Sequence, residues 1–423
     1  MNLFPLIIIF FLAFIPRLIL LLVTSFPNPG WSPHWNLATG ILKYHTFGYH
    51  GERVTNIEPG YPFFLAVSRF LAHENIIGTF CFQAAFASIG AVFLFLLALE
   101  LIQDRKAAWL CVFFYAFYPY LIGQSVSIIE VPVFTTLLIA SVYFFVRVQK
   151  RTPNSFYGSA VCGIVFGLTI LVRSMIMPAF ILSLVTLIFR KKNAPLITIS
   201  IFLFAATAPW FLRSHSVDGA WIPPRGGWNF LQGNCPYSDK IIPAYNPDLL
   251  DAYVSKILEE KRPDLIAVEK ETDAAESDKL FRAEAFDYIK IHPWQTVKLK
   301  IKNMIYLFYP RIVPFYSMDE KTSIHLLDAE NFEVLNTPKR GWLRELSYTL
   351  TYTPIFILAL AGIYLRQKKL SDDLILYFII LNFTAVYALC WPATRLRVPM
   401  DFILMLFAAG ALTQWKRLVS YDN

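Results

Sequence analysis

The chain has 423 residues, of which 56% are hydrophobic and only 16% are charged. Soluble domains carry nearer a quarter of charged residues, so this composition argues against a water-soluble enzyme. The formal net charge is +8, but Lys and Arg cluster at the ends of apolar runs, which indicates membrane topology and not a nucleic-acid surface. We therefore expect an all-α polytopic membrane protein that contacts membrane lipids and has no nucleic-acid partner.

Apolar segments that approach the length of a spanning helix, about 20 residues, recur along the whole chain. We expect ten of them, at 6–23, 77–101, 107–124, 131–147, 156–172, 176–189, 195–212, 345–365, 374–391 and 399–415. The first run resembles a signal peptide, but it lacks a basic start and a small-residue cleavage site and contains Arg17. We interpret it as a retained first transmembrane helix.

The basic residues predict the orientation of these segments. With a cytoplasmic N-terminus, every even-numbered segment ends on a cytoplasmic basic cluster, as the positive-inside rule requires. The clusters contain Arg105, Lys106, Arg147, Lys150, Arg151, Arg190, Lys191, Lys192, Arg366, Lys368, Lys369, Lys416 and Arg417. The short cytoplasmic links leave little room for a catalytic domain there.

The long connections 24–76 and 213–344 then lie on the extracytoplasmic side. All seven histidines fall there as well, which favours polar chemistry on that side, although histidine is in any case rare in lipid; they are His34, His45, His50, His73, His215, His292 and His325. We expect a transmembrane core at 1–212 that includes the first outer loop (24–76), an extracytoplasmic helical segment at 213–344, and C-terminal transmembrane helices at 345–423.

Ionisable residues among apolar ones are candidates for function, because each costs on the order of 2.5–3.5 kcal/mol on membrane-insertion scales. Arg17 lies inside the first segment, where it either pairs internally or binds an anion. Glu130 lies in the link SIIEVP before the fourth segment, either as a carboxylate favoured by the helix dipole or as a site residue. Arg173 follows the fifth segment.

Arg395 and Arg397, in TRLRVP before the last segment, are two basic residues on the outer side, against the positive-inside trend. They are either interfacial anchors or phosphate ligands, since guanidinium forks suit phosphate.

Two further motifs lie in the outer segments. Glu58 precedes a Pro-Gly-Tyr-Pro turn that contains Tyr61 and leads into an amphipathic helix. The run GGWNFLQGNCP at 226–236, which contains Asn234, is typical of a loop that approaches a ligand closely.

Taken in chain order, these motifs resemble the GT-C class of membrane glycosyltransferases, of the bacterial family 39 and 83 type, which includes protein mannosyltransferases and the aminoarabinose transferases that act on lipid A. The resemblance rests on Arg17, PGYPFFLA at 59–66, Glu130, Arg173, the run at 226–236, HPW at 292–294 heading an amphipathic helix, and RLRVP at 395–399. It spans nearly the whole chain, although each motif is weak alone. It implies a GT-C-type bundle of about ten transmembrane helices in the bacterial inner membrane.

The resemblance also implies an activity, which is transfer of a sugar from a polyprenyl-phosphate carrier to a lipid, glycan or protein acceptor on the extracytoplasmic face, with inversion. Arg395 and Arg397, helped by Arg173, would hold the donor phosphate, with Tyr61 and Asn234 as further substrate-binding residues. Glu58, His34 and Glu130 would be catalytic. Glu58 and Glu130 would also hold a divalent cation, Mg²⁺ or Mn²⁺, that bridges to phosphate.

One departure from the family pattern bears on the general base. Such enzymes usually carry an acid, most often Asp, early in the first outer loop, whereas the stretch PGWSPHWNLATG at 29–40 contains none. We expect Glu58, or else His34, to serve as the base.

Two rival hypotheses remain for the function. A non-catalytic GT-C-fold binding protein is favoured by the missing acid. A transporter of a lipid-linked sugar would need a polar path across the membrane, and the apolar segments offer few residues for one.

Overall fold

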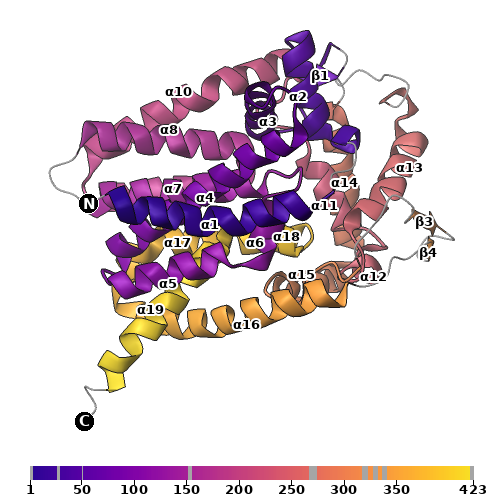
Figure 1. Ribbon diagram of the computed structural model, residues 1–423. Helices are drawn as coiled ribbons and strands as arrows, with labels where there is room; N and C mark the ends of the chain where they lie inside the picture. Colours follow the sequence, from indigo (N-terminus) through magenta and orange to yellow (C-terminus); the bar gives the residue numbers. More distant parts are fainter. Residues whose placement is uncertain are drawn as a thin grey trace.

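The computed structural model describes residues 3–25, 29–49, 51–150, 155–265, 274–316, 323–326, 332–335 and 341–419. His50 and Arg151 lie outside the described residues. The chain forms a helical bundle with a cap of shorter helices at one end (Figure 1).

Apolar helices of 6 to 26 residues build the bundle. They are α1 (Leu3–Val23), α4 (Ile76–Leu101), α5 (Arg105–Ala116), α6 (Pro119–Gln124), α7 (Val131–Lys150), α8 (Phe156–Val172), α9 (Met177–Phe189), α10 (Asn193–Asp218), α16 (Trp342–Leu365), α17 (Leu370–Leu389) and α19 (Asp401–Val419). Among the described residues, seven of the helices are long and apolar enough to cross a membrane, and α8 and α9 are shorter apolar helices. The chain is therefore an all-α polytopic membrane protein, as its composition predicts.

The predicted segment 107–124 is not one helix. Tyr118 has an extended backbone with φ −76° and ψ 108°, and Pro119 then begins α6. Proline is favoured at this first helical position because it has no N–H to donate. The prediction of one spanning helix there is wrong, because the hydropathy of the run does not register the break at the proline.

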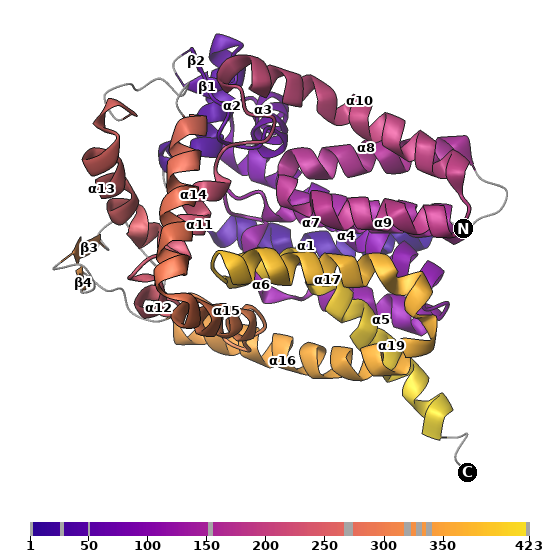
Figure 2. The ribbon, with the colours of Figure 1, turned by 180° about the vertical axis from the view of Figure 1, so that it is seen from behind.

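The other elements lie at one end of the bundle, opposite both termini (Figures 1 and 2). The first outer loop contains α2 (Pro33–Tyr44), the hairpin β1 (Gly48–Tyr49) with β2 (Glu52–Arg53), and α3 (Gly60–Leu71). The outer segment contains α11 (Gly226–Gln232), α12 (Ser238–Ile241), α13 (Asp251–Lys261), α14 (Ala274–Ile291), α15 (Pro293–Leu307), and the antiparallel hairpin β3 (Ser323–Leu326) with β4 (Phe332–Leu335). A four-residue helix, α18 (Thr394–Arg397), precedes α19.

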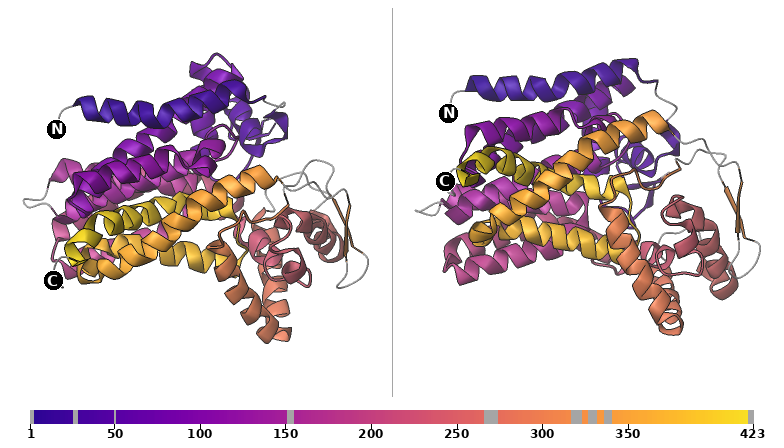
Figure 3. Two further views of the ribbon diagram at one scale, coloured as in Figure 1. Left: turned by 60° about the horizontal axis from the view of Figure 1, so that its bottom comes forward. Right: turned by 90° about the horizontal axis from the view of Figure 1, so that it is seen from below.

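The outer segment forms a group of helices at one end of the bundle (Figure 3). It packs around a small core of its own, which includes Leu231, Leu250 and Phe281. The amphipathic helices predicted within 248–304 are α13, α14 and α15, and α15 begins at the Pro of the HPW motif. The run predicted as a loop at 226–236 is partly wrong, since residues 226–232 form α11.

At the opposite end, basic side chains bind helix carbonyls. Lys150 donates to the carbonyl of Glu100 (2.6 Å), and Lys192 donates to that of Val148 (3.0 Å). Cations near C-terminal carbonyls are favoured by the helix dipole. The basic clusters that indicate topology therefore also hold helix ends in place.

Burial differs greatly between the helices. In the most apolar 18-residue stretch of α7, 83% is buried inside the protein, against 22% of the corresponding stretch in each of α1 and α10. Helix α7 packs against α4 and α8, so it lies at the centre of the bundle (Figure 2).

Candidate functional site

A cavity of about 1380 Å³ lies between the bundle and the outer segment. This exceeds the roughly 300–1,000 Å³ of a usual small-molecule pocket. We call its polar residues from the bundle and first outer loop the inner wall: His34, Glu58, Glu130, Arg173, Tyr387 and Arg395. Those from the outer segment are the outer wall: Arg225, Trp228, Asn229, Gln232, Asp248, Asp251 and Arg282.

Helix ends position the inner wall. Glu130 directly precedes α7, and Arg173 follows the last residue of α8. Glu58 lies two residues before α3, which starts at Gly60; a Cβ there would lie 2.8 Å from the backbone of Leu171 at the end of α8. Only glycine permits this approach, which brings Glu58 beside the end of α8.

Glu130 and Arg173 form a buried ion pair. Arg173 donates through Nε (3.0 Å) and Nη2 (2.5 Å) to Oε1 of Glu130, and through Nη1 to the Tyr387 hydroxyl (3.3 Å). Burial by itself would raise the pKa of Glu130. The nearby Arg173 and His34 lower this pKa by more than burial raises it, so the pKa is about 2. The pKa of Arg173 is raised, because Glu130 outweighs the effect of burial. Glu130 is therefore an anion, and too weak a base to take a proton from a hydroxyl.

His34 lies in the first turn of α2 and faces the other oxygen of Glu130, with Nε2 3.7 Å from Oε2. Burial lowers its pKa, Glu130 raises it, and Arg225 and Arg173 lower it again, with a net decrease from 6.5. The imidazole is therefore neutral at pH 7, and its buried Nδ1 has no hydrogen-bond partner among the described residues. A neutral imidazole next to a carboxylate can accept a proton.

Glu58 is half-buried and lines the same cavity. Its Oε1 accepts a hydrogen bond from the Ser174 hydroxyl (3.0 Å). Both candidate bases thus lie on the inner wall, on either side of the Glu130–Arg173 pair.

Arg395 and Arg397 have different surroundings. Arg395 lines the cavity, its side chain is 36% exposed, and its Nη2 lies 3.7 Å from Oδ2 of Asp248. Arg397 is fully buried, does not line the cavity, and binds both oxygens of Asp401 (2.9 and 3.0 Å). Of these two arginines, only Arg395 lies where it can meet a ligand in the cavity.

Tyr61 and Asn234 are buried behind the cavity. The Tyr61 hydroxyl donates to Gln83 (2.8 Å), and the edge of its ring packs on His34. The Asn234 amide donates to the carbonyls of Phe230 (2.7 Å) and Leu389 (3.0 Å). Neither residue lines the cavity; Tyr61 packs on His34, which does, and Asn234 joins the end of α11 to the end of α17.

Arg17 is also fully buried away from the cavity. Its Nε donates to the Ser125 hydroxyl (3.1 Å) and its Nη1 to the carbonyl of Ala13 (2.7 Å). These contacts join Arg17 to the chain that leads to Glu130, while its buried Nη2 has no hydrogen-bond partner among the described residues.

A metal bound by Glu58 and Glu130 does not fit these contacts. Glu130 Oε1 already accepts two bonds from Arg173, and Glu58 Oε1 accepts one from Ser174. In the part of the chain that the structure describes, no group of three or more His, Cys, Asp or Glu residues could hold a metal ion. Divalent cations prefer several oxygen ligands, so no step below is routed through one.

The outer wall contains residues that the sequence did not single out one by one, although Trp228 and Gln232 lie within the run at 226–236 that it did. Trp228 and Gln232 lie on α11, and Asp251 begins α13. Asp248, which faces Arg395, is held by Asn246 (2.6 Å) in a short turn. The Asn-Pro-Asp run at 246–248 marks a turn in the sequence, but no pattern indicates that it faces a cavity.

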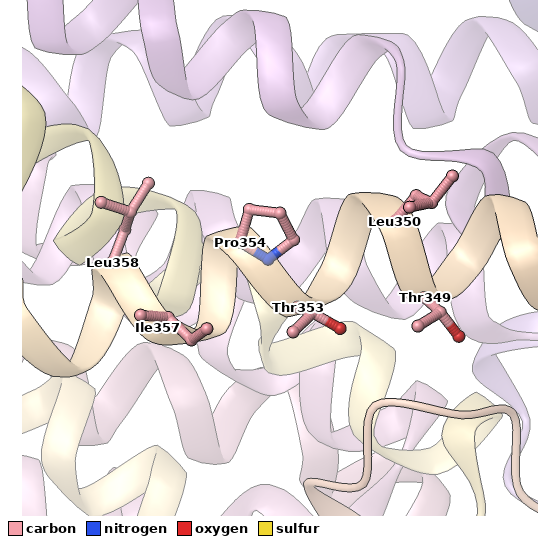
Figure 4. Close-up of a pocket in the computed structure, with 6 residues that line it drawn as sticks. All are labelled: Thr349, Leu350, Thr353, Pro354, Ile357 and Leu358. Atoms are coloured by element: carbon pink, nitrogen blue, oxygen red, sulfur yellow. The ribbon is translucent and has the colours of Figure 1, made fainter.

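A second hollow, of about 510 Å³, runs along α16 (Figure 4). Its lining is Thr349, Leu350, Thr353, Pro354, Ile357 and Leu358. It contains no ionisable group, so we place no chemistry there.

No protein-family model matches the chain, and no curated protein matches it. Among solved structures, the chain is similar to ArnT from Cupriavidus metallidurans bound to undecaprenyl phosphate, with a TM-score of 0.43 and 12% identity over 97% of this chain and 78% of that one. It is similar to the apo state of ArnT with a TM-score of 0.42 and 12% identity over 96% and 77% of the two chains.

Proposed function

We propose that the chain is a glycosyltransferase that moves a sugar from a polyprenyl-phosphate carrier to an acceptor hydroxyl. One observation carries the proposal: Glu58, His34, the Glu130–Arg173 pair and Arg395 converge on one large cavity at the end of an apolar bundle. Such a cavity suits a lipid-borne phosphate, because guanidinium groups bind the phosphate and apolar helix ends accommodate the carrier.

The location of the reaction follows from the basic clusters. They lie at the bundle end opposite the cavity, so the positive-inside rule supports an extracytoplasmic site in the bacterial inner membrane. In this proposal, 1–212 and 345–423 form the membrane core, and 213–344 forms an extracytoplasmic segment above it. The acceptor is a lipid, a glycan or a protein.

In the proposed reaction, the acceptor oxygen attacks the anomeric carbon on the face opposite the phosphate. The new C–O bond forms while the bond from this carbon to the phosphate oxygen breaks, so the configuration inverts. The acceptor proton passes to Glu58 or His34, and the phosphate leaves with the bonding electron pair, its charge stabilised by Arg395. Glu130 orients His34 and Arg173 and takes no proton.

The test is sugar transfer by the full chain in nanodiscs, supplied with a panel of polyprenyl-phosphate monosaccharides and with extracted envelope lipids, glycans and proteins as acceptors. Release of bare polyprenyl phosphate and formation of a glycosylated acceptor are measured together. Neutralising the base, in Glu58→Gln or His34→Ala, should lower the rate by about 10²–10⁴. Glu52→Gln, an exposed acid of the same loop that does not line the cavity, is the matched control.

The pH profile distinguishes the two bases. Because the pKa of His34 is lowered from 6.5, a reaction that needs neutral His34 keeps its kcat/KM above pH 6.5 and loses it only below that value. An acid limb that persists unchanged in His34→Ala would assign the proton to Glu58.

A non-catalytic binding protein is the second candidate, because α2 presents His34 and not an acid to the cavity. Tight binding of the carrier without transfer to any acceptor would favour this reading over the transferase.

A further inference from the structure

The outer wall holds a hydrogen-bonded group that the proposed reaction does not use. Gln232 Nε2 (2.7 Å) and Trp228 Nε1 (3.1 Å) both donate to Oδ1 of Asp251. The two bonds fix the indole, the amide and the carboxylate relative to each other. Trp228 is also packed edge to face on Phe281, with ring centroids 5.4 Å apart.

This group has spare hydrogen-bond acceptors at the cavity. Gln232 is 1% exposed and lines the cavity, yet its buried Oε1 has no hydrogen-bond partner among the described residues. Asp251 is exposed and lines the same cavity, and both bonds to its carboxylate end on Oδ1, which leaves Oδ2 available to accept a hydrogen bond. Buried acceptors are nearly always satisfied, so an unpaired one beside a cavity indicates a ligand that donates hydrogen bonds.

The indole adds an apolar surface to these acceptors. Trp228 lines the cavity one helical turn from Gln232 on α11. A sugar ring combines C–H groups, which pack against an aromatic ring, with hydroxyl groups, which donate to carboxylate and amide oxygens. These side chains therefore suit a polyhydroxylated ring better than a purely apolar or a purely charged group.

The neighbouring carboxylates of Asp251 and Asp248 disfavour an anion held against Asp251, although Arg225 and Arg282 line the same wall. Burial and Asp248 raise the pKa of Asp251 by more than Arg225 and the bonds from Trp228 and Gln232 lower it. The resulting pKa is about 6. At pH 7 Asp251 is therefore mainly a carboxylate beside a second one. An anionic group would be repelled by both, whereas a hydroxyl would be accepted.

The group also adjoins the arginine that faces the cavity. Asp248 Oδ2 lies 3.7 Å from Arg395, and Asp251 follows three residues later at the start of α13. A sugar held by Asp251 is thus next to a phosphate held by Arg395. We propose that Trp228, Gln232 and Asp251 form the subsite for the sugar ring of the donor; this inference rests on the proposed function.

The experiment compares two kinds of probe on the full chain in nanodiscs. One is bare polyprenyl phosphate, and the other is the panel of polyprenyl-phosphate monosaccharides. The wild type should bind at least one sugar-bearing carrier more tightly than the bare carrier. Asp251→Asn and Trp228→Leu should each reduce this preference about tenfold or more, the effect of one lost hydrogen bond to a charged group or of a lost aromatic contact.

Two controls separate a lost subsite from a misfolded protein. Each variant should bind the bare carrier as the wild type does, which shows that the bundle and Arg395 are intact. Glu259→Gln, on the same helix as Asp251 but exposed and not lining the cavity, should keep the wild-type preference.

Two outcomes would overturn the inference while the proposed function stands. In one, the wild type binds bare and sugar-bearing carriers equally; in the other, the variants weaken both kinds of probe by the same factor. Failure of the wild type to bind any carrier is a different result, because it removes the proposed function itself.

Discussion

Arg395 and Arg397 show how two residues of one motif come to have different tasks. Arg395 is 36% exposed in the cavity, whereas Arg397 has no exposed surface. We expect Arg395→Ala to bind polyprenyl phosphate about tenfold or more weakly, because it removes a charge-assisted contact worth about 1.5–3 kcal/mol. Titration of nanodisc-embedded protein with the bare carrier measures this, and the unfolding temperature should stay near that of the wild type.

Arg397→Ala is the matched comparison. It leaves Asp401 buried without its cation, a loss of the kind that costs about 3–5 kcal/mol, so the change should appear in thermal unfolding. Wild-type carrier binding by Arg395→Ala, or wild-type stability of Arg397→Ala, would contradict this division of roles.

The sequence shows part of this site at the level of single residues. Glu130 and Arg173 are conspicuous because they interrupt apolar runs, where an ionisable group is costly. The motif alone does not distinguish Arg397 from Arg395, because it does not show that Arg397 is buried. Asp401 stands four residues after Arg397, and this helical spacing is the signal that indicates an internal ion pair.

At the level of elements, α15 joins the end of α11 to the C-terminal end of α17. Lys300 on α15 donates to the carbonyls of Gly233 (2.9 Å) and Leu389 (2.8 Å), and Asn303 donates to that of Ala388 (3.1 Å). Lys300→Met should therefore loosen the outer segment from the bundle. Faster amide hydrogen exchange in α11 and α15 is the expected result, and Lys298→Met, at an exposed position of the same helix, should leave exchange unchanged.

The same lysine predicts a pH dependence. Burial lowers the pKa of Lys300 to about 8, although Cys390 and Cys235 raise it. Because the folded pKa is below the ordinary 10.5, the folded state holds fewer protons between these values, and stability rises as pH increases from 8 to 10.5. Lys300→Met should lack this rise, and its persistence in the variant would assign the effect to another group.

Element boundaries were predictable where lipid dictates them and less so elsewhere. The apolar runs of α1, α4 and α7 predict helices because a membrane leaves the backbone no other way to satisfy its hydrogen bonds. The glycines at 226–227 predict a loop, yet α11 begins there. The reason is tertiary packing, since the Gly227 N–H donates to Asp278 of α14 (2.5 Å) and a side chain at 227 would collide with that residue.

For the whole molecule, the arrangement predicts which end faces outward. In a cysteine-free background, a cysteine at Asp264, exposed in the outer segment, should react with a membrane-impermeant maleimide in intact spheroplasts. A cysteine at Lys368, exposed at the opposite end, should react only after permeabilisation. The reverse pattern would overturn the orientation and the extracytoplasmic site with it.

At this scale the sequence predicts the membrane core but not the cavity. Glu130 and Arg173 of the inner wall lie at helix ends that hydropathy locates, whereas His34 and Glu58 lie in the first outer loop. The outer wall comes from polar helices with many similar side chains. Only the packing of α11 and α13 places Asp251 and Trp228, and not others, at the cavity. Such long-range packing leaves no local pattern in the chain.

The burial of α7 has a mechanical consequence for the site next to its N-terminus. Because neighbouring helices enclose α7, we expect Glu130, which directly precedes it, and Arg173, which is hydrogen-bonded to Glu130, to be held firmly in place. The outer wall instead belongs to the outer segment. Side chains such as Lys300 and Asn234 hydrogen-bond this segment to the end of α17 in the bundle. We expect any opening of the cavity for bulky ligands to come from the outer segment, while Glu130 and Arg173 keep their positions.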